Sequence, residues 1–418
     1  MLRLDAYKVY LIMGAVAAFA TSMIFTILAV YYVQEVGMNP LQLVLVGTLL
    51  EGTILVFEVP TGVVADTYSR RLSVIVGVAL IGVCYVMQGF LPLFAAILAA
   101  EFIRGVGETF ISGASSAWIA DEVGESAVGR VYLRQGQVSR IGSFAGIAAG
   151  AGLATLHLAL PIVLGGALLL SLSAFLALAM PETGFRPAAR EAAAPWQTMR
   201  EIARAGAKVV RGRPVVLMLA LVGVVFGAFS EGFDRLWEAH FLQTLAFPVW
   251  PALPPVVWIG LLNAGSMVIG IAVAEALVRR LDLADGRRLG VLLFATTAGL
   301  VVSVVAFGLA PSFAVGVAAF WSGGVLRSLQ YPLASTWLNQ HLPSRVRATV
   351  LSMVGQADAL GQVAGGPVVG FVGLRSLRAA LVVAGLILTP AVVLYGRGLR
   401  LAGDEPLIEP DQPVAADA

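Results

Sequence analysis

The chain has 418 residues, of which 59% are hydrophobic and 12% charged, and its mean hydropathy is +0.89. Soluble domains carry about twice that share of charge, so the composition predicts an integral membrane protein. The single cysteine and the three scattered histidines argue against a disulfide framework and against a metal site. No nucleotide-binding or HExxH motif is present, so we expect no cofactor, no nucleic-acid partner and no enzymatic activity.

Runs of about 20 apolar residues predict twelve membrane-spanning helices. The first six are expected at 9–33, 41–65, 72–91, 94–118, 131–156 and 161–180, and the last six at 214–242, 256–280, 289–309, 313–337, 347–373 and 378–396. In this section helix 1 to helix 12 are these twelve spans in chain order. They define an N-terminal six-helix bundle (1–180) and a C-terminal six-helix bundle (214–400). We expect 181–213 to be a cytoplasmic amphipathic linker and 401–418 to be a disordered tail.

The basic residues predict the orientation. Most of the 27 Lys and Arg fall on the side that holds both termini and the linker, and only Arg375 and Arg378 fall on the other. Because Lys and Arg concentrate in cytoplasmic loops, we expect both termini in the cytoplasm and the chain in the cytoplasmic membrane.

A short polar segment, Gly62-Val-Val-Ala-Asp66-Thr-Tyr-Ser-Arg70-Arg71, joins the second and third predicted spans. We call it the clasp. It resembles the loop between helices 2 and 3 of the major facilitator superfamily, whose pattern is roughly Gly-x-x-x-Asp-Arg-x-Gly-Arg-Arg. Thr67 and Ser69 depart from that pattern. The alternative is a positive-inside anchor with a chance aspartate, because arginine pairs often follow spans.

The resemblance implies that the clasp closes the cytoplasmic side of an alternating-access transporter. Asp66 would face the start of helix 11 near Arg347, where unsatisfied N–H groups favour an anion. Arg70 and Arg71 would meet the acids that end helix 4, Asp121 and Glu122. Gly62, Asp66, Arg70, Arg71, Asp121 and Arg347 are therefore the candidate cytoplasmic gate.

The two halves also repeat in one register, 219 residues apart. Pro92 matches Pro311, Trp118 matches Trp337, and Gly136-Gln137 matches Gly355-Gln356. In the superfamily two parallel repeats enclose a substrate site near the midplane. The expected fold is an all-α membrane protein with twelve transmembrane helices in two parallel six-helix pseudo-repeats. The expected partners are a small-molecule substrate, protons and the lipid bilayer, and we expect a monomer.

Charged residues inside spans are candidates for function because burying charge is costly. In helix 4, Glu101, Arg104 and Glu108 share one face, and Arg104 has the spacing to pair with either acid. Arg104-Gly105-Val-Gly107 resembles the helix 4 signature Arg-x-x-x-Gly of proton antiporters in the superfamily. There the arginine is thought to hold a nearby carboxylate charged. A purely structural pair within the helix is the alternative.

Helix 7 places Glu231, Asp234, Arg235 and Glu238 on one face. Three carboxylates around one arginine predict that at least one holds a proton. This stretch resembles helix 7 of macrolide and tetracycline exporters. Glu238 lies near the outer end, where hydration is the alternative, so Glu231 or Asp234 is the preferred proton carrier.

The remaining candidates are single residues on other spans. Glu51 and Glu58 of helix 2 and Asp358 of helix 11 complete the proton-coupling set, and Arg327 of helix 10 is pseudo-symmetric to Glu108. We hypothesise that Glu108 and Arg327 approach across the cavity. The candidate cavity residues are Arg104, Arg235, Arg327, Phe229, Phe233, Trp237 and Tyr331. Membrane-interface anchoring is the alternative for the aromatic residues. The spacing Gly142-x3-Gly146-x3-Gly150 predicts close helix packing.

These patterns favour proton-coupled efflux of amphipathic drug-like compounds. The alternative is a proton-coupled carrier of a polar or anionic metabolite, because the arginines within spans have the chemistry to clamp a carboxylate or phosphate. Arginines that face the cavity without a partner would favour the carrier. A membrane-embedded enzyme or receptor is a third possibility, but no nucleophile–base constellation supports it.

Overall fold

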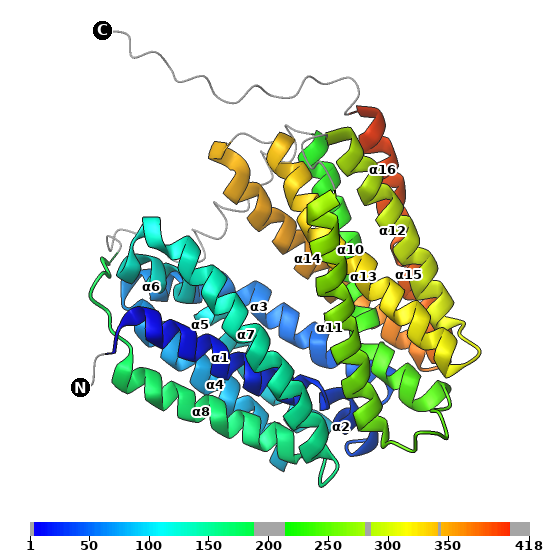
Figure 1. Cartoon of the computed structure of the whole chain (residues 1–418), viewed down its shortest axis with the longest axis horizontal. Helices are drawn as coiled ribbons and strands as arrows, with labels where there is room; N and C mark the ends of the chain where they lie inside the picture. Colours follow the sequence, from blue (N-terminus) through cyan, green and yellow to red (C-terminus); the bar gives the residue numbers. More distant parts are fainter. Residues whose placement is uncertain (1–3, 188–213, 281–285, 342–343, 402–418) are drawn as a thin grey trace. The chain divides into compact units, whose positions relative to one another are not determined.

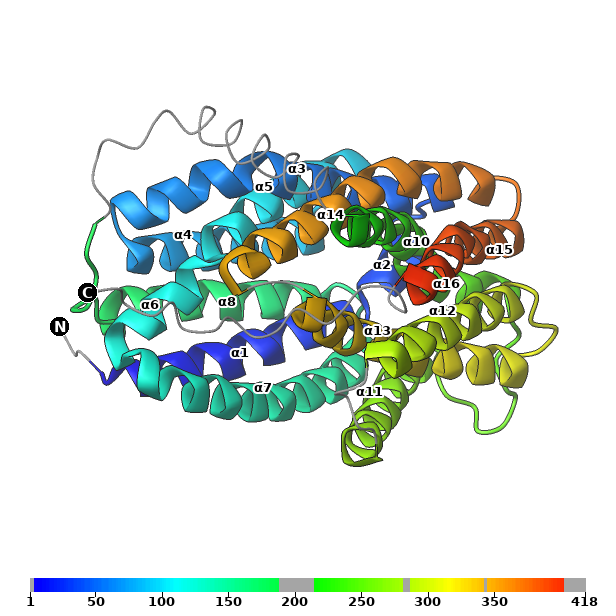
Figure 2. The same cartoon turned by 90° about the horizontal axis from the view of Figure 1, so that it is seen from above.

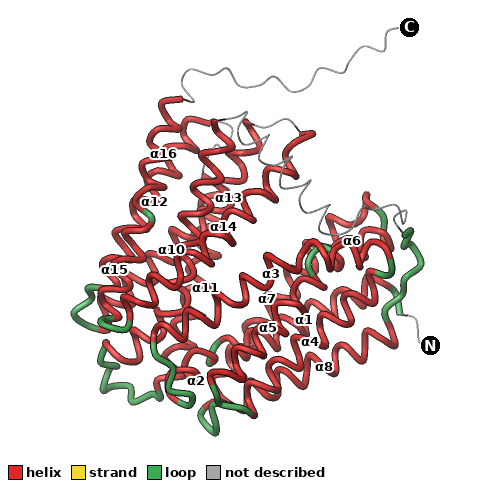
Figure 3. Tube along the Cα trace, turned by 180° about the vertical axis from the view of Figure 1, so that it is seen from behind, coloured by secondary structure: helices red, strands yellow, loops and turns green. Residues whose placement is uncertain are grey.

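The computed structural model describes residues 4–187, 214–280, 286–341 and 344–401 (Figure 1). Most of the expected linker, the expected tail and the side chain of Arg347 lie outside the described residues. Within the described ranges every regular element is a helix (Figure 3). Eight of the described helical stretches are long and apolar enough to cross a membrane.

The chain divides into two compact units. Among described residues, unit 1 holds 4–187 with 235–264, and unit 2 holds 214–234 with the rest from 265. The helices of the first 187 residues are α1 (Ala6–Phe25), α2 (Leu28–Gln34), α3 (Pro40–Thr67), α4 (Arg70–Phe90), α5 (Phe94–Ile111), α6 (Ala114–Val123), α7 (Glu125–Ala154) and α8 (Leu160–Ala179). The later helices are α10 (Pro214–Thr244), α11 (Pro255–Arg280), α12 (Gly286–Gly308), α13 (Phe313–His341), α14 (Ser344–Gly373), α15 (Leu377–Ile387) and α16 (Thr389–Leu401).

Helix starts in unit 1 follow from local capping chemistry. Asn39 caps α3 by accepting the N–H of Gln42 at 2.9 Å, and the Gln42 side-chain oxygen accepts the N–H of Asn39 at 3.0 Å. Pro40 fits the first helical position, where no N–H is needed. Ser69 caps α4 by accepting the N–H of Leu72 at 2.9 Å. Ser69, which departs from the superfamily pattern, therefore serves as the N-cap of α4.

Close packing of α1 against α7 fixes one side of unit 1 (Figure 2). The predicted glycine spacing of α7 is confirmed as a packing surface. Side chains at Gly142, Gly146 and Gly150 would collide with the backbone of α1 at Ala15, Phe19 and Met23 respectively. The other face of α1 packs on α8, and α4 packs on both α8 and α5. The α3 helix packs mainly on α5.

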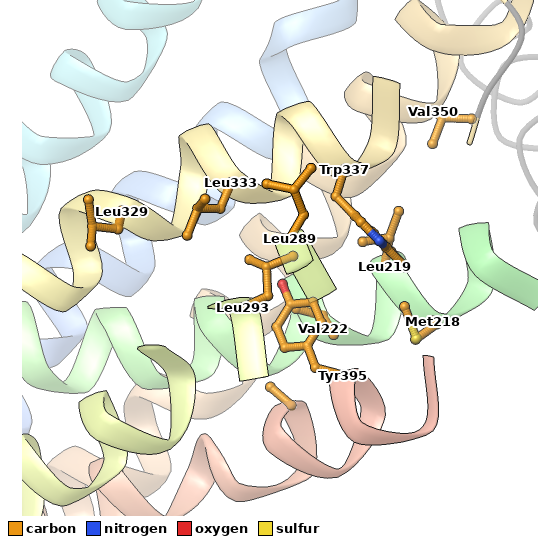
Figure 4. Packing of buried hydrophobic residues seen from close by; sticks show 11 residues of the cluster. Met218, Leu219, Val222, Leu289, Leu293, Leu329, Leu333, Trp337, Val350 and Tyr395 are labelled. Atoms are coloured by element: carbon orange, nitrogen blue, oxygen red, sulfur yellow. The ribbon is translucent and has the colours of Figure 1, made fainter. Parts of the chain in front are cut away.

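Unit 2 has an apolar core centred on α12 and α13. Leu289 and Leu293 of α12 are fully buried, and Trp337 of α13 and Tyr395 of α16 are each 3% exposed beside them (Figure 4). The α12 helix also packs on α15. These apolar contacts hold α12, α13 and the last two helices together.

Three expected spans contain a break in the helix, although 9–33 and 378–396 each still correspond to one helical stretch long and apolar enough to cross a membrane. The span 9–33 breaks between Phe25 and Leu28, 94–118 breaks at Ser112 and Gly113, and 378–396 breaks at Leu388. Gly113 has φ +69°, a conformation that side-chain-bearing residues rarely adopt. Span 131–156 instead starts earlier, at Glu125, directly after Gly124 with φ +80°.

The packing of α1 on α7 generates a stability prediction. Gly146→Ala is expected to destabilise the protein by about 1–3 kcal/mol, because the new methyl group meets the Phe19 carbonyl and the backbone must move. The matched control is Gly152→Ala on the same helix, where nothing lies within 4 Å. The midpoints of thermal unfolding in detergent measure both changes. Equal midpoints for the two variants would contradict this packing.

Candidate functional site

The clasp is held by one arginine that serves two helices. The Arg70 guanidinium donates to the Asp66 carboxylate one turn earlier, at 3.1 and 3.3 Å, and also to Asp121 of α6. The Phe185 ring centroid lies 5.8 Å from the same guanidinium. The expected contact between Arg70 and Asp121 is therefore present.

The other arginine of the clasp differs from expectation. Arg71 does not reach the acids of α6 but donates to the Ala177 carbonyl at 2.5 Å. Ala177 lies in the last turn of α8, where unpaired carbonyls attract a cation. Glu122 instead accepts the Thr183 hydroxyl at 2.7 Å and the Gly184 N–H at 2.7 Å.

Residues 181–185, directly after α8, fasten onto the clasp as a strap. Trp118 of α6 donates to the Pro181 carbonyl at 2.7 Å. Glu182 accepts the Ser69 hydroxyl at 2.7 Å and the Arg71 backbone N–H at 2.9 Å. Sequence reasoning missed Glu182, although a Pro-Glu pair at the end of a span was the available signal.

Arg104 is buried inside unit 1, where it forms an ion pair with Glu101. The Arg104 Nε lies 2.9 Å from Glu101 Oε2, and the two side chains are 4% and 1% exposed. Arg104 also donates to the Tyr85 hydroxyl at 2.8 Å, and the Phe25 ring centroid lies 5.4 Å from its guanidinium. Of the two acids that the helical spacing allowed, the structure selects Glu101.

The Glu101 carboxylate is held from two further helices. Gln88 of α4 donates to Glu101 Oε1 at 2.8 Å, and the Tyr32 hydroxyl of α2 donates to Gln88 Oε1 at 2.7 Å. Tyr31 donates to the Gln88 backbone carbonyl at 2.6 Å. Sequence reasoning missed Gln88 and Tyr85 because an uncharged polar residue in a span gives little signal by itself.

Two further acids of unit 1, Glu58 of α3 and Glu108 of α5, lie near the ends of these helices that adjoin Ser112. Glu58 accepts the Ser112 hydroxyl at 3.1 Å, and Glu108 is half-buried one turn before Ser112. Glu108, Ser112, Ile54, Thr109 and Ile111 line a pocket of about 270 Å³. Among the described residues, no hydrogen bond or ion pair reaches the Glu108 side chain.

In unit 2, Arg327 of α13 binds Asp234 of α10 through both of its terminal nitrogens. One of these bonds, from Nη2 to Oδ2, measures 2.7 Å, and the other joins Nη1 to Oδ1. The Phe229 ring centroid lies 5.5 Å from the same guanidinium. Asp358 of α14 accepts the Gln362 amide at 2.8 Å. Sequence reasoning proposed Glu108 as the partner of Arg327; within its own unit Arg327 is paired with Asp234.

The remaining candidates occupy different environments. Phe229, Phe233, Trp237, Glu231 and Glu238 are buried, Glu51 and Arg235 are half-buried, and Tyr331 is 77% exposed. Phe233 stacks on Phe229 with ring centroids 5.5 Å apart and also contacts Phe307 and Phe320. Gly62 lies within α3 with open space around its Cα. Substrate binding at these residues stays a prediction.

The sequence model of the Major Facilitator Superfamily matches residues 10–284. The chain belongs to the major facilitator superfamily. It is therefore an integral membrane transporter of small molecules and not an enzyme. An uncharacterized MFS-type transporter, YxaM of Bacillus subtilis strain 168, is 21% identical over 377 residues, which is 89% of this chain and 91% of that protein.

Solved structures share the fold of this transporter. The nucleoside transporter NupG covers 96% of this chain and 100% of its own, at 12% identity and a TM-score of 0.73. A POT family transporter in complex with a thioalcohol-conjugated peptide covers 96% and 98%, at 12% identity and a TM-score of 0.71. A bacterial homologue of the human lysosomal transporter Spinster covers 94% and 96%, at 15% identity and a TM-score of 0.66. Because these proteins differ in what they carry, the shared fold does not select a substrate.

The pairing in unit 2 generates a prediction about charge exchange. Asp234→Arg and Arg327→Asp are each expected to impair transport, because each leaves like charges facing one another. The double variant restores opposite charges and is expected to recover transport above either single variant. Uptake assays normalised to folded protein measure this recovery.

The parallel pair, Glu108→Arg with Arg327→Glu, tests the pseudo-symmetric hypothesis in the same assay. Recovery in that pair alone would show that the Asp234 contact is dispensable and that Glu108 is the working partner of Arg327.

Proposed function

We propose that this transporter exports amphipathic, neutral or cationic drug-like compounds in exchange for protons, by alternating access. The observation that supports this most directly is that the buried Arg104 and the partly exposed Arg327 are both already bound to carboxylates. An acid in the same region of unit 1, Glu108, has no such counter-ion among the described residues.

The paired arginines argue against a clamp for anions. Arg104 is bound to Glu101, and Arg327 is bound to both oxygens of Asp234. A carboxylate or phosphate substrate would have to displace these bidentate or buried partners, and a buried charge left alone costs several kcal/mol. The anionic-metabolite carrier is therefore the less supported alternative.

Glu108 and Glu58 supply the chemistry that proton exchange needs. Glu108 and Ser112 line a pocket. Glu58 of the neighbouring helix α3 accepts a hydrogen bond from Ser112. A carboxyl group with this surrounding can gain or lose a proton without breaking an ion pair. A compound with a cationic group can then compete with the proton for the same negative charge.

We also infer that the two bundles are structural repeats. In unit 1, Gly142 and Gly146 of α7 meet Ala15 and Phe19 of α1. In unit 2, Gly361 and Gly365 of α14 meet Val224 and Ala228 of α10 in the same pairing. The spacing within each pair of glycines and each pair of partners is identical.

The next position on these helices shows a reciprocal exchange, which further supports the repeat. Gly150 of α7 meets Met23 of α1, whereas Gly232 of α10 meets Val369 of α14. Each unit has one glycine where the two helices cross. In unit 1 the glycine is on α7, the later helix of its pair, and in unit 2 it is on α10, the earlier helix. A packing constraint common to both bundles explains this exchange.

The orientation proposal follows from charge. The clasp, the strap and most Lys and Arg lie on one side of the predicted spans, which we assign to the cytoplasm. Asp66, Arg70 and Asp121 would then act as part of a cytoplasmic gate in the cytoplasmic membrane, with the transporter working as a monomer.

Proton movement in liposomes tests the proposal. Purified transporter is reconstituted with an internal pH indicator, and lipophilic cations, macrolides, tetracyclines and small organic anions are added in turn. We expect proton movement that depends on a lipophilic compound and falls at least about tenfold in Glu108→Gln, the size typical of losing a proton-transfer group. Glu125→Gln, an exposed acid at the start of α7, is the matched control and is expected to keep full coupling.

The other candidate acids are compared in the same assay as Glu231→Gln and Asp234→Asn. Loss of coupling in Glu231→Gln with normal coupling in Glu108→Gln would move the proton carrier to α10. Proton movement driven by organic anions alone would contradict the export proposal and favour the metabolite carrier.

A further inference from the structure

The break between α5 and α6 has a geometry that only glycine adopts readily. Gly113 has φ +69° and ψ −44°, and the Ala114 N–H donates to the Ser112 carbonyl across it at 2.7 Å. This is a γ-turn of the rarer hand, which is strained for residues that carry a side chain. The chain therefore contains a defined joint between α5 and α6.

Two side chains of α3 support this joint. Glu58 accepts the Ser112 hydroxyl at 3.1 Å. The Thr61 hydroxyl lies 3.1 Å from the Thr109 carbonyl, which would accept the Gly113 N–H if the helix continued. Thr61 also lies 2.8 Å from the Phe57 carbonyl of its own helix, so its proton is shared between the two.

The supporting helix is itself weakened at the same level. Pro60 lies inside α3, between Glu58 and Thr61. Proline removes one helical hydrogen bond and is the commonest cause of a sharp helix kink. Points of low bending stiffness in α3 and in the α5–α6 pair are thus adjacent.

The segment beyond the joint, α6, carries residues that bind the clasp and the strap. Asp121 of α6 binds Arg70 of α4, and Trp118 of α6 donates to the Pro181 carbonyl of the strap. Asp66, the other partner of Arg70, lies beyond Pro60 on α3. A rotation of α6 about Gly113 therefore changes the distance between Asp121 and Arg70.

The pocket lined by Glu108 adjoins the joint at Gly113. Its lining includes Glu108, Thr109 and Ser112, and Glu58 is bound to Ser112. The other charged groups on the helices of unit 1 that pack against α3 are Glu101 and Arg104 on α5, Arg70 and Arg71 on α4, and Asp121 and Glu122 on α6. Arg104 is bound to Glu101, and Arg70 is bound to Asp66 and Asp121, so neither neutralises this pocket by direct contact.

We propose that Ser112 and Thr61 are positioning residues that link the protonation of Glu58, which is bound to Ser112 beside the Glu108 pocket, to the closure of the clasp through the joint at Gly113. This inference rests on the proposed proton coupling. A hydrogen bond to an ionised carboxylate is about twice as strong as one to a neutral group, so ionised Glu58 holds Ser112 and keeps α6 in place. Protonation of Glu58 from solvent loosens Ser112, α6 rotates, and Asp121 separates from Arg70. Release of the proton to solvent restores the hold.

Distances within unit 1 test the inference independently of any motion between the units. Spin labels are placed on Leu72→Cys of α4 and Ser116→Cys of α6, both exposed. Cys84, the one native cysteine of the sequence, is buried and stays in place. The distance distribution of the full-length protein is measured at a series of pH values from about 3.5 to about 8, which covers the usual range of carboxyl groups in folded proteins.

We expect a longer distance at the lower pH values in the parent protein. Ser112→Ala, Thr61→Val and Glu58→Gln are each expected to show the longer distance at every pH value of the series. Thr61→Ser is expected to restore the pH dependence, because the hydroxyl is retained. Thr53→Val is the matched control: Thr53 is also a buried threonine of α3, but its hydroxyl bonds only to Leu49 of its own helix, at 2.7 Å.

Two outcomes would overturn the proposed role of the joint. One is a distance in the parent protein that does not depend on pH while liposomes show proton-coupled transport; this leaves the proposed function standing. The other is an unchanged pH dependence in both Ser112→Ala and Thr61→Val. Conversely, a pH-dependent distance that Thr61→Val abolishes, in a protein whose transport moves no protons, supports the joint and overturns proton coupling.

Discussion

The cost of placing charge in a low-dielectric interior shapes each unit of this transporter. A buried arginine needs a carboxylate and further hydrogen bonds, or it destabilises the fold by several kcal/mol. Arg104, which is buried, meets this need with Glu101, Tyr85 and the Phe25 ring. Arg327 is only partly buried and is paired in the same way, with Asp234 and the Phe229 ring. Both pairs are internal to one unit, so motion of one unit against the other does not have to break them.

The same requirement explains how interrupted helices are tolerated. A break leaves carbonyl and N–H groups without helical partners, and such groups need others. Near the break between α1 and α2, the Thr26 hydroxyl donates to the Ser22 carbonyl at 2.6 Å, and α2 is tied to α4 through Tyr31 and Tyr32. At the break between α5 and α6 the partners come from α3. In both places side chains from neighbouring helices hold a point where the backbone is free to bend.

The all-helical membrane class could be predicted from sequence because a hydrophobic run is a local property, and eight of the described helical stretches are long and apolar enough to span. The glycine stripe of α7 was predictable for the same reason, since its spacing places Gly142, Gly146 and Gly150 on one helical face. The helix breaks were not predictable, because an isolated Ser-Gly step is compatible with a helix. What stabilises the break at Gly113 is Glu58 and Thr61, which lie about fifty residues earlier in the chain.

The candidate site was predicted as a set of residues but not as a set of pairs. Helical spacing allowed Arg104 to bind either Glu101 or Glu108, and the choice depends on Gln88 and Tyr32, which belong to other helices. Asp234 and Arg327 are 93 residues apart, and no local pattern joins them. The binding of the strap to the clasp through Glu182 was also missed, because Glu182 and the Ser69–Arg71 segment are more than 100 residues apart.

The central claim is that Glu108, an acid with no ion-pair partner among the described residues, exchanges its proton for the substrate, and that no arginine binds the substrate. The most direct test is to add a transported compound to purified transporter in weakly buffered detergent solution and to measure proton release and compound binding together. The account predicts that binding of a lipophilic cation releases protons, and that Glu108→Gln abolishes this release while binding persists. Binding without proton release in the unaltered protein, or release that is unchanged in Glu108→Gln, would contradict it.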